Sequence, residues 1–308
     1  MKTDEFPTYT VIALIVMGAV FISLYSNPIS SWSASANYEN VSIDTRVNIT
    51  HSEPRITSVV IDNGVDNITL NAGQTRSVVC NITVRDYNGY DDVNMTNATL
   101  WDDDSVNMGD VDDENNHYTN SSCTNVGNDG TYISYWECGF AVYYYANNGS
   151  NWKCNATAID DYNFTDSNYN TTTINPLYAL NVTQQIDYGN MAVGDTSDAK
   201  TANITNFGNM DLNISLFGYG GDNFAVGNGL SFICEKGNIS VDNERYALND
   251  IAWGLMTNLT NTSNMISDLT MPQRTDAEII NTTFWKLYVP PNPFGQCNGT
   301  VVFNAEVS

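Results

Sequence analysis

The sequence predicts an all-β protein made of two tandem β-sandwiches. From about Arg55 onward, short segments of alternating apolar and polar residues recur roughly every 8 to 15 residues, as the strands of sandwiches do. Tight-turn dipeptides separate these segments, among them Asn63-Gly64, Asn88-Gly89 and Asn148-Gly149. Because no convincing amphipathic helix lies between the strands, the pattern favours packed sheets over a parallel sheet covered by helices.

Composition divides the chain into four parts. Residues 1–26 are predicted to form a hydrophobic helix, and the Ser- and Asn-rich residues 27–50 a stalk or a docking strand, with the strand near Val41 to Thr50. Residues 51–178 are predicted as the first sandwich, and residues 179–308 as the second. The exported length of about 280 residues suits two domains of ordinary size.

The strand signals are clearer in the first sandwich than in the second. Segments are expected at residues 56–61, 68–70, 77–84, 99–101, 132–136, 140–145 and 152–158. In the second sandwich, residues 283–289 and 299–305 flank a Pro-rich turn and are predicted to pair with each other. Residues 247–259 fit either a short helix or an irregular segment.

The N-terminal apolar run favours a retained membrane anchor. Thr8 to Tyr25 carry no charge, and these 18 residues as a helix just span a hydrocarbon core roughly 30 Å thick. The small-x-small triplet Ala34-Ser35-Ala36 offers the alternative of a cleaved signal peptide. The run is long for a signal and lies far from Ala36, so we favour an anchor with the rest of the chain outside the cell.

Asn-x-Ser/Thr triplets, the acceptors for N-glycosylation in exported proteins, are unusually frequent. The chain has nineteen of them, whereas its 43 Asn and 54 Ser plus Thr would give roughly 7 or 8 by chance. None lies in the N-terminal apolar run. We therefore predict N-linked glycans at Asn40, Asn48, Asn67, Asn81, Asn94, Asn97, Asn120, Asn148, Asn155, Asn163, Asn170, Asn181, Asn203, Asn213, Asn238, Asn258, Asn261, Asn281 and Asn298.

Two short motifs open the second sandwich. They are a Tyr-Gly-x-x-x-Val-Gly turn and a Thr-Asn-x-Gly-Asn-x-x-Leu-x-Ile strand–turn–strand. The matching residues are Tyr188, Gly189, Val193, Gly194, Asn206, Gly208, Asn209, Leu212 and Ile214. Over about 30 residues they resemble the repeated motif of ASH/choice-of-anchor-type immunoglobulin-like domains. The resemblance implies an immunoglobulin-like fold used for binding or spacing, and it implies no chemistry.

Six cysteines, an even number in a chain expected to be exported, predict three disulfides. Their spacing alone does not give the connectivity. Cys80 and Cys154 lie in strand-like segments, and a bridge between facing sheets beside a Trp, here Trp152, is the immunoglobulin arrangement. That likeness implies the pair Cys80–Cys154 and leaves the pairs Cys123–Cys138 and Cys234–Cys297.

Acidic and amide side chains follow two predicted strands of the first sandwich, which end at Val84 and Ala158. Neighbouring strands of one sandwich would bring both groups to the same end, where they would supply the roughly six to eight oxygens that calcium takes. The same residue types also occupy turns for backbone reasons, so two interpretations stay open. The candidate calcium ligands are Asp86, Asn88, Asp91, Asp92, Asp160 and Asp161.

The net charge of −24 arises from scarce Lys and Arg as much as from acidic residues. Such a surface repels nucleic acid and anionic headgroups, so we expect neither as a partner. The acidic run at 102–104 and 110–114 is expected to be a solvated loop, with a loose cation site as the alternative. In its dense sequons and single N-terminal apolar segment, the chain resembles archaeal cell-surface proteins.

The sequence contains no motif for catalysis. Its two histidines, His51 and His117, lie in no catalytic motif, and the chain has no nucleophile elbow, phosphate loop or nucleotide fingerprint. Only paired-carboxylate glycoside hydrolysis, which needs no motif, stays open as enzyme chemistry. We predict a non-enzymatic structural or adhesive surface glycoprotein, bound to the membrane by its N-terminal helix and to other surface proteins or its own copies. The alternatives are a subunit of an extracellular filament or lattice and a calcium-dependent recognition module.

Overall fold

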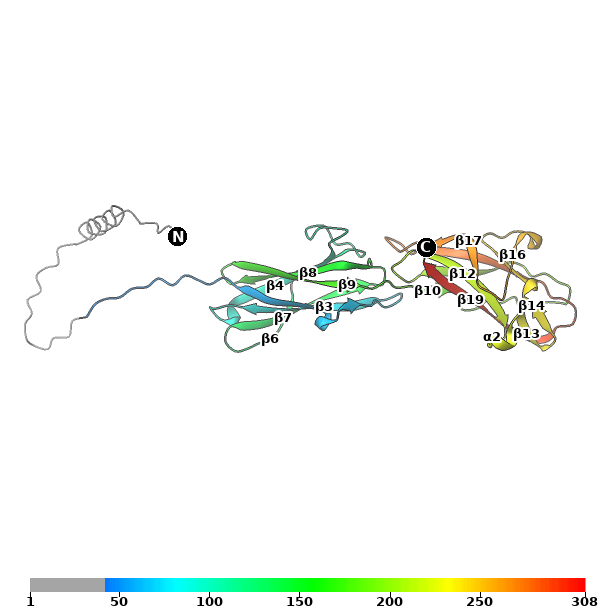
Figure 1. Cartoon of the computed structure of the whole chain (residues 1–308), viewed down its shortest axis with the longest axis horizontal. Coiled ribbons are helices and arrows are strands. Elements are labelled where there is room, and N and C mark those ends of the chain that lie inside the picture. Colours follow the sequence, from blue (N-terminus) through cyan, green and yellow to red (C-terminus); the bar gives the residue numbers. More distant parts are fainter. Residues whose placement is uncertain (1–41, 308) are drawn as a thin grey trace, which may run out of the picture. The chain divides into compact units, whose positions relative to one another are not determined.

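The computed structural model describes residues 42–307, and these are almost entirely β-structure (Figure 1). The predicted N-terminal helix and residues 27–41 of the predicted stalk lie outside the described residues. Over residues 42–307, no helix is long and apolar enough to cross a membrane. The chain divides into two units between Thr50 and His51, and every described strand belongs to the second unit.

The first sandwich uses residues between Arg55 and Ile174. Its strands are β1 (Arg55–Ile61), β2 (Asn67–Ile68), β3 (Thr75–Arg85), β4 (Val93–Asp102), β5 (His117–Asn120), β6 (Thr124–Asn128), β7 (Ile133–Tyr143), β8 (Gly149–Asp160) and β9 (Thr165–Ile174). One sheet has the order β1-β3-β7-β6 and the other β2-β9-β8-β4-β5. Neighbours are antiparallel except β2 and β9, which are parallel.

Alternation of buried and outward side chains builds the core of the first sandwich. In β3, every second side chain from Val78 to Val84 is buried, and the same period continues in β7 and β8. The pairing of β3 with β7 runs unbroken from Thr75↔Tyr143 to Arg85↔Ile133, which fixes this alternation in register. The predicted segments 132–136 and 140–145 are therefore largely one strand. Strand β9 escaped prediction because residues 165–171 place almost no side chain in the core.

The second sandwich uses residues between Leu180 and Val307. Its strands are β10 (Leu180–Val182), β11 (Lys200–Asn206), β12 (Leu212–Gly220), β13 (Leu230–Lys236), β14 (Asn238–Ser240), β15 (Glu244–Ala247), β16 (Thr257–Asn258), β17 (Asn264–Met271), β18 (Ile280–Leu287) and β19 (Phe294–Val307). The sheets have the orders β10-β11-β18-β15-β16 and β14-β13-β19-β12-β17. A single helical turn, α2 (Phe224–Gly227), follows β12.

Two expectations for the second sandwich need correction or completion. The predicted pairing of residues 283–289 with 299–305 is wrong, because β18 and β19 lie in different sheets. The connection between them crosses from one layer to the other, which a Pro-rich turn permits as readily as a hairpin. The undecided residues 247–259 contain a 3₁₀ turn (Trp253–Leu255) and the short strand β16, with no α-helix.

The motif around Asn206 has a local structural reason. Its buried amide donates to the carbonyl oxygens of Met210 at 2.7 Å and Met271 at 3.1 Å, while its Oδ1 accepts the Gly208 N–H at 2.8 Å. A Cβ at Gly208 would lie 2.0 Å from the Leu177 carbonyl oxygen, so only glycine fits there. The motif thus supplies hydrogen-bond partners for the buried backbone groups of the turn between β11 and β12.

Residues 42–50 form no strand, contrary to the prediction for this segment, and all nine are exposed. Ile43, Val47 and Ile49 keep 82 to 83% of their surface accessible. In an extended chain these three residues share one face, since their positions differ by even numbers. The apolar pattern that predicted a strand is therefore present without a partner strand in the described chain.

Candidate metal centre

Three side chains from distant parts of the first sandwich meet at one of its ends. The Nε2 atom of His51 lies 2.8 Å from Asp92 Oδ2 and 3.2 Å from Asp160 Oδ2. One ligand atom from each of the three residues lies within 4.8 Å of the others. An imidazole and two carboxylates this close together are the donor set of a metal site.

The sheet itself brings the two carboxylates together. Asp160 is the last residue of β8 and pairs with Val93 of β4, directly after the 3₁₀ turn Tyr90–Asp92 that carries Asp92. The Asp161 N–H donates to the Asp92 carbonyl oxygen at 3.0 Å. Strand register at Val93 and Asp160 therefore fixes the backbone around both carboxylates, and His51 reaches the site from the segment just before β1.

Backbone donors orient the fully buried carboxylate of Asp160. Its Oδ1 accepts the N–H groups of Tyr162 at 2.9 Å and Phe164 at 2.8 Å. This arrangement turns the loop after β8 and leaves Oδ2 facing His51. The rings of the same two residues flank the imidazole, with centroids at 4.1 Å for Tyr162 and 5.8 Å for Phe164.

A third carboxylate, that of Asp86, is fully buried directly after β3. Its Oδ1 accepts the Asn88 N–H at 2.8 Å, while its Oδ2 has no hydrogen-bond partner. Burial raises the pKa of Asp86, and the negative charges of Asp92 and Asp160 raise it further. The Asn88 hydrogen bond and the charge of His51 act in the opposite direction on this pKa.

The six predicted calcium ligands separate into two groups. Asp86, Asp92 and Asp160 surround the same end of the sandwich, although β3 and β8 lie in facing sheets and are not the neighbouring strands that the prediction supposed. The other three point elsewhere: Asp91 and Asp161 are exposed, and Asn88 Oδ1 accepts the Ser52 N–H at 2.7 Å.

No local motif marks His51 as a site residue. It lies 109 residues from Asp160, in a segment with no motif, and its role depends on where β1 enters the sandwich. A search for polar residues immediately before the first strand of a sandwich, opposite an acidic strand end, would have selected it.

The second acidic run is exposed at 103, 104, 110 and 112–114, as expected for a solvated loop, and differs from that expectation at Asp102. Asp102 is 3% exposed, and its Oδ2 accepts the Ser105 hydroxyl at 2.6 Å. The ring nitrogens of His117 lie 2.9 Å from Asp112 Oδ1 and 3.0 Å from the Met108 carbonyl oxygen. Both nitrogens of His117 therefore have oxygen partners within the loop, so this histidine serves the fold.

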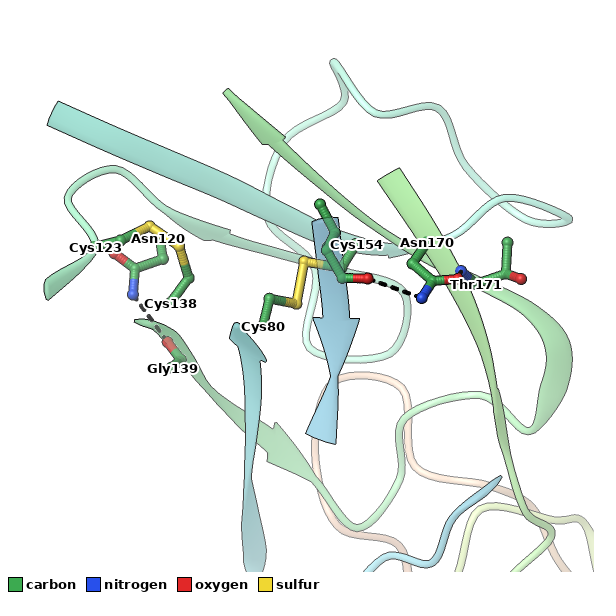
Figure 2. The surroundings of a disulfide bond; sticks show 9 residues. Cys80, Asn120, Cys123, Cys138, Gly139, Cys154, Asn170 and Thr171 are labelled. Carbon is green, nitrogen blue, oxygen red and sulfur yellow. Dashed lines mark hydrogen bonds between the residues drawn. A yellow bond between two sulfur atoms is a disulfide. The ribbon is translucent and has the colours of Figure 1, made fainter. Parts of the chain in front are cut away.

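Three disulfides join the same cysteine pairs that the immunoglobulin likeness gave. Figure 2 shows the two that lie in the first sandwich. Cys80–Cys154 connects β3 to β8 and so ties the two sheets of the first sandwich together. Cys123–Cys138 fastens the segment before β6 to β7. Cys234–Cys297 joins directly opposed residues of β13 and β19 within one sheet.

The sequon asparagines of the described chain all reach the surface. Eighteen of the nineteen lie in residues 42–307, and each is exposed or half-buried. The buried asparagines of the described residues are Asn115, Asn206 and Asn209, and none of them begins a sequon. Figure 2 shows two of the sequon residues, Asn120 and Asn170. The Asn120 amide donates to the Gly139 carbonyl oxygen at 3.0 Å, and Asn170 is exposed. The predicted acceptor at Asn40 lies outside the described residues.

No protein-family model matches the chain, and no curated protein matches it. Among solved structures, it is similar to a complex of CsuC with the tip adhesion subunit CsuE from Acinetobacter baumannii, with 13% identity and a TM-score of 0.32. That match covers 78% of this chain and 96% of the other.

A second similarity, to a structure of carbohydrate-binding modules of the β-sandwich superfamily, has 10% identity and a TM-score of 0.24 and covers 83% of this chain and 97% of the other. A third, to the secreted serine protease VesC of Vibrio cholerae, has 10% identity and a TM-score of 0.19. It covers 78% of this chain but only 49% of VesC, so the chain spans about half of that protein. At these identities and TM-scores the similarities define neither a family nor a function.

Proposed function

We propose that this chain is a non-enzymatic, N-glycosylated protein of the extracellular cell surface, with a structural or adhesive role. Its N-terminal hydrophobic segment would tether it to the membrane. Its partners would be other surface proteins or its own copies. The proposal is carried by one observation, the surface position of all eighteen sequon asparagines in the described residues.

The disulfides support an exported location, because buried disulfides form and persist in oxidising compartments. Six of six cysteines are paired, so no thiol is left for metal or redox chemistry. Two sandwiches closed in this way suit a chain that must withstand proteolysis outside the cell. Glycans along the strands would also shield sheet edges from pairing with other proteins.

Glycopeptide mass spectrometry of the protein from its native cells tests the proposal. We expect glycan masses on several sequon asparagines, for example Asn67, Asn94, Asn203 and Asn258, which are exposed. Buried Asn115, Asn206 and Asn209 serve as internal controls and should carry none. Unmodified asparagine at every sequon would contradict the proposal.

A second candidate function, a filament or lattice subunit, is favoured by the segment 42–50. The backbone of this segment would add a strand to the sheet edge of a second copy. Its exposed apolar side chains would then pack against the core of that copy; they are Ile43, Val47 and Ile49. Electron microscopy of the sheared surface fraction, beside a detergent extract of the membranes, separates the two candidates. Ordered filaments or sheets that Val47→Asp/Ile49→Asp abolishes would favour assembly, and monomers released only by detergent would favour a tethered adhesin.

A further inference from the structure

We propose that His51, Asp92 and Asp160, with the buried carboxylate of Asp86 nearby, form a binding site for a divalent transition-metal ion of the zinc type. The ion would fasten the chain where it enters the first sandwich. The proposal starts from the imidazole and carboxylates that meet within 4.8 Å, and from the buried Asp86 oxygen that has no hydrogen-bond partner. It does not depend on the proposed surface function.

The number of free donor atoms distinguishes zinc from calcium. In Asp160, Oδ1 already accepts two backbone N–H groups, so this residue offers only Oδ2. With Asp92 Oδ2 and His51 Nε2, the site presents three donors that lie within 4.8 Å of one another, the number of protein ligands in a zinc site that keeps its fourth position for water. Zinc takes about four nitrogen, oxygen or sulfur ligands, whereas calcium takes roughly six to eight oxygens and does not favour imidazole.

The distances between the donor atoms are also close to those around a tetrahedral zinc ion. Four ligands at bonds of about 2.0 to 2.1 Å around a tetrahedral ion lie about 3.3 Å from one another. His51 Nε2 lies 2.8 Å and 3.2 Å from the oxygens of Asp92 and Asp160. Only a small widening of the cluster would accommodate the ion.

Without a metal ion, the positive and negative charges of the cluster do not balance. His51 supplies at most one positive charge to three carboxylates, two of which are fully buried. The contact at 2.8 Å between His51 and Asp92 lacks hydrogen-bond geometry, since Asp92 Oδ2 is buried without a hydrogen-bond partner. Buried charges need compensation, and a divalent cation would provide it for all three carboxylates at once.

The residues behind the donors hold them in place, as in known metal sites. The rings of Tyr162 and Phe164 flank the imidazole, and the N–H groups of the same residues fix Asp160. The Ser52 N–H donates to Asn88 Oδ1 at 2.7 Å, which ties the residue after His51 to the turn that carries Asp86. Metal binding would therefore immobilise the chain at the boundary between residues 42–50 and the first sandwich.

Metal titration of the full-length protein in mild detergent, after removal of metal with a chelator, tests the proposal. We expect one Zn²⁺ per chain by elemental analysis, and a rise in Tm of roughly 5 °C or more at saturating Zn²⁺. Calcium at millimolar concentration should raise Tm by much less. Co²⁺ in the same site should give the intense visible absorption of a four-coordinate ion.

His51→Ala should abolish the stoichiometric Zn²⁺ and the Co²⁺ spectrum while the protein still folds, because His51 is half-buried and lies outside the strands. Asp92→Asn keeps the side-chain size and is the second variant should His51→Ala fail to fold. Asp91→Asn and Asp161→Asn are matched controls on exposed neighbouring acids and should bind Zn²⁺ normally. Absence of bound Zn²⁺, binding unchanged in both site variants, or a larger Tm rise with Ca²⁺ would each overturn the proposal.

Discussion

The two sandwiches of this chain achieve a closed β core by different means. The first has one contiguous cluster of 23 buried apolar residues and a disulfide between its sheets. The second divides its buried apolar residues between a cluster of 11 and a cluster of 3, and its disulfide lies within one sheet. Packing across the layers of the second sandwich thus has no covalent support.

The two sandwiches also differ in where they bury acidic side chains. Glu244, at the start of β15, is 3% exposed and pairs with the Tyr188 hydroxyl at 2.8 Å. Burial raises the pKa of Glu244 to about 7, against a smaller opposing effect of the Tyr188 hydrogen bond. In the first sandwich, Asp86, Asp92 and Asp160 gather near His51 at one end, while the second buries Glu244 in its interior. We expect the second sandwich to respond to pH and the first to metal.

Removal of the inter-sheet disulfide should have the largest effect. Cys80→Ala/Cys154→Ala opens a loop with a sequence separation of 74, which should lower the free energy of unfolding by roughly 4 kcal/mol. The fully buried sulfurs would also leave cavities and add to this cost. Urea denaturation followed by tryptophan fluorescence measures the loss.

The matched control is Cys234→Ala/Cys297→Ala. Its sequence separation of 63 gives nearly the same entropic loss, but both cysteines are half-buried, so the cavity cost should be smaller. A smaller loss of unfolding free energy in the Cys80/Cys154 variant than in the Cys234/Cys297 variant would contradict the comparison.

Glu244→Gln should remove a pH dependence of the second sandwich. Because the folded-state pKa of Glu244 is raised, the neutral acid is favoured by folding. Its full contribution to stability is present below the unfolded pKa of about 4.5 and is lost as pH rises through about 7. Glutamine is neutral at every pH and still accepts the Tyr188 hydrogen bond, so the variant should gain roughly 3 kcal/mol over the wild type at pH 8 and little at pH 4.

Unfolding free energies at a series of pH values measure this effect. Glu137→Gln, an exposed acid in β7, is the control in the first sandwich and should leave the profile unchanged. Parallel pH profiles for the wild type and Glu244→Gln would argue against a buried neutral acid.

A pair of glycine substitutions compares the packing of the two sandwiches. A Cβ at Gly218 in β12 would lie 2.4 Å from Cδ2 of the fully buried Leu259, so Gly218→Ala should cost about 1 to 3 kcal/mol. A Cβ at Gly139 in β7 meets nothing within 4 Å, and its backbone has no positive φ. Gly139→Ala should therefore be neutral or stabilise by about 0.5 kcal/mol. Thermal melts report both, and equal costs would show that Leu259 moves aside.

The smallest effect concerns the order of disulfide reduction. A thiol reagent must reach the sulfur, and Cys234 and Cys297 are half-buried while Cys80 and Cys154 have no exposed surface. Under mild dithiothreitol we expect Cys234–Cys297 to open first. Alkylation and peptide mapping at timed intervals measure the order, and earlier loss of Cys80–Cys154 would show that the first sandwich opens more readily than its burial indicates.

Sequence reasoning identified the chemistry of the candidate site better than its geometry. Asp86, Asp92 and Asp160 were selected because acids follow strand ends, a local property that sequence displays. Asp91 and Asp161 were selected on the same ground, but their side chains point to solvent, since neighbouring residues project in different directions. His51 was missed because its contact with Asp160 spans 109 residues and has no local signature.

By itself, the sequence determined the all-β class, the cysteine pairs that the immunoglobulin likeness gave, and the surface character of the sequons. The first and the last follow from local alternation, turn residues or composition, which act over a few neighbouring positions, whereas the cysteine pairs follow only from the resemblance. Only the tertiary structure decided which sheet each strand joins, and so separated β18 from β19 and set β3 opposite β8. It also decided which acids lie buried around His51 and that Glu244 lies inside, because burial and long-range pairing depend on contacts between residues far apart in the chain.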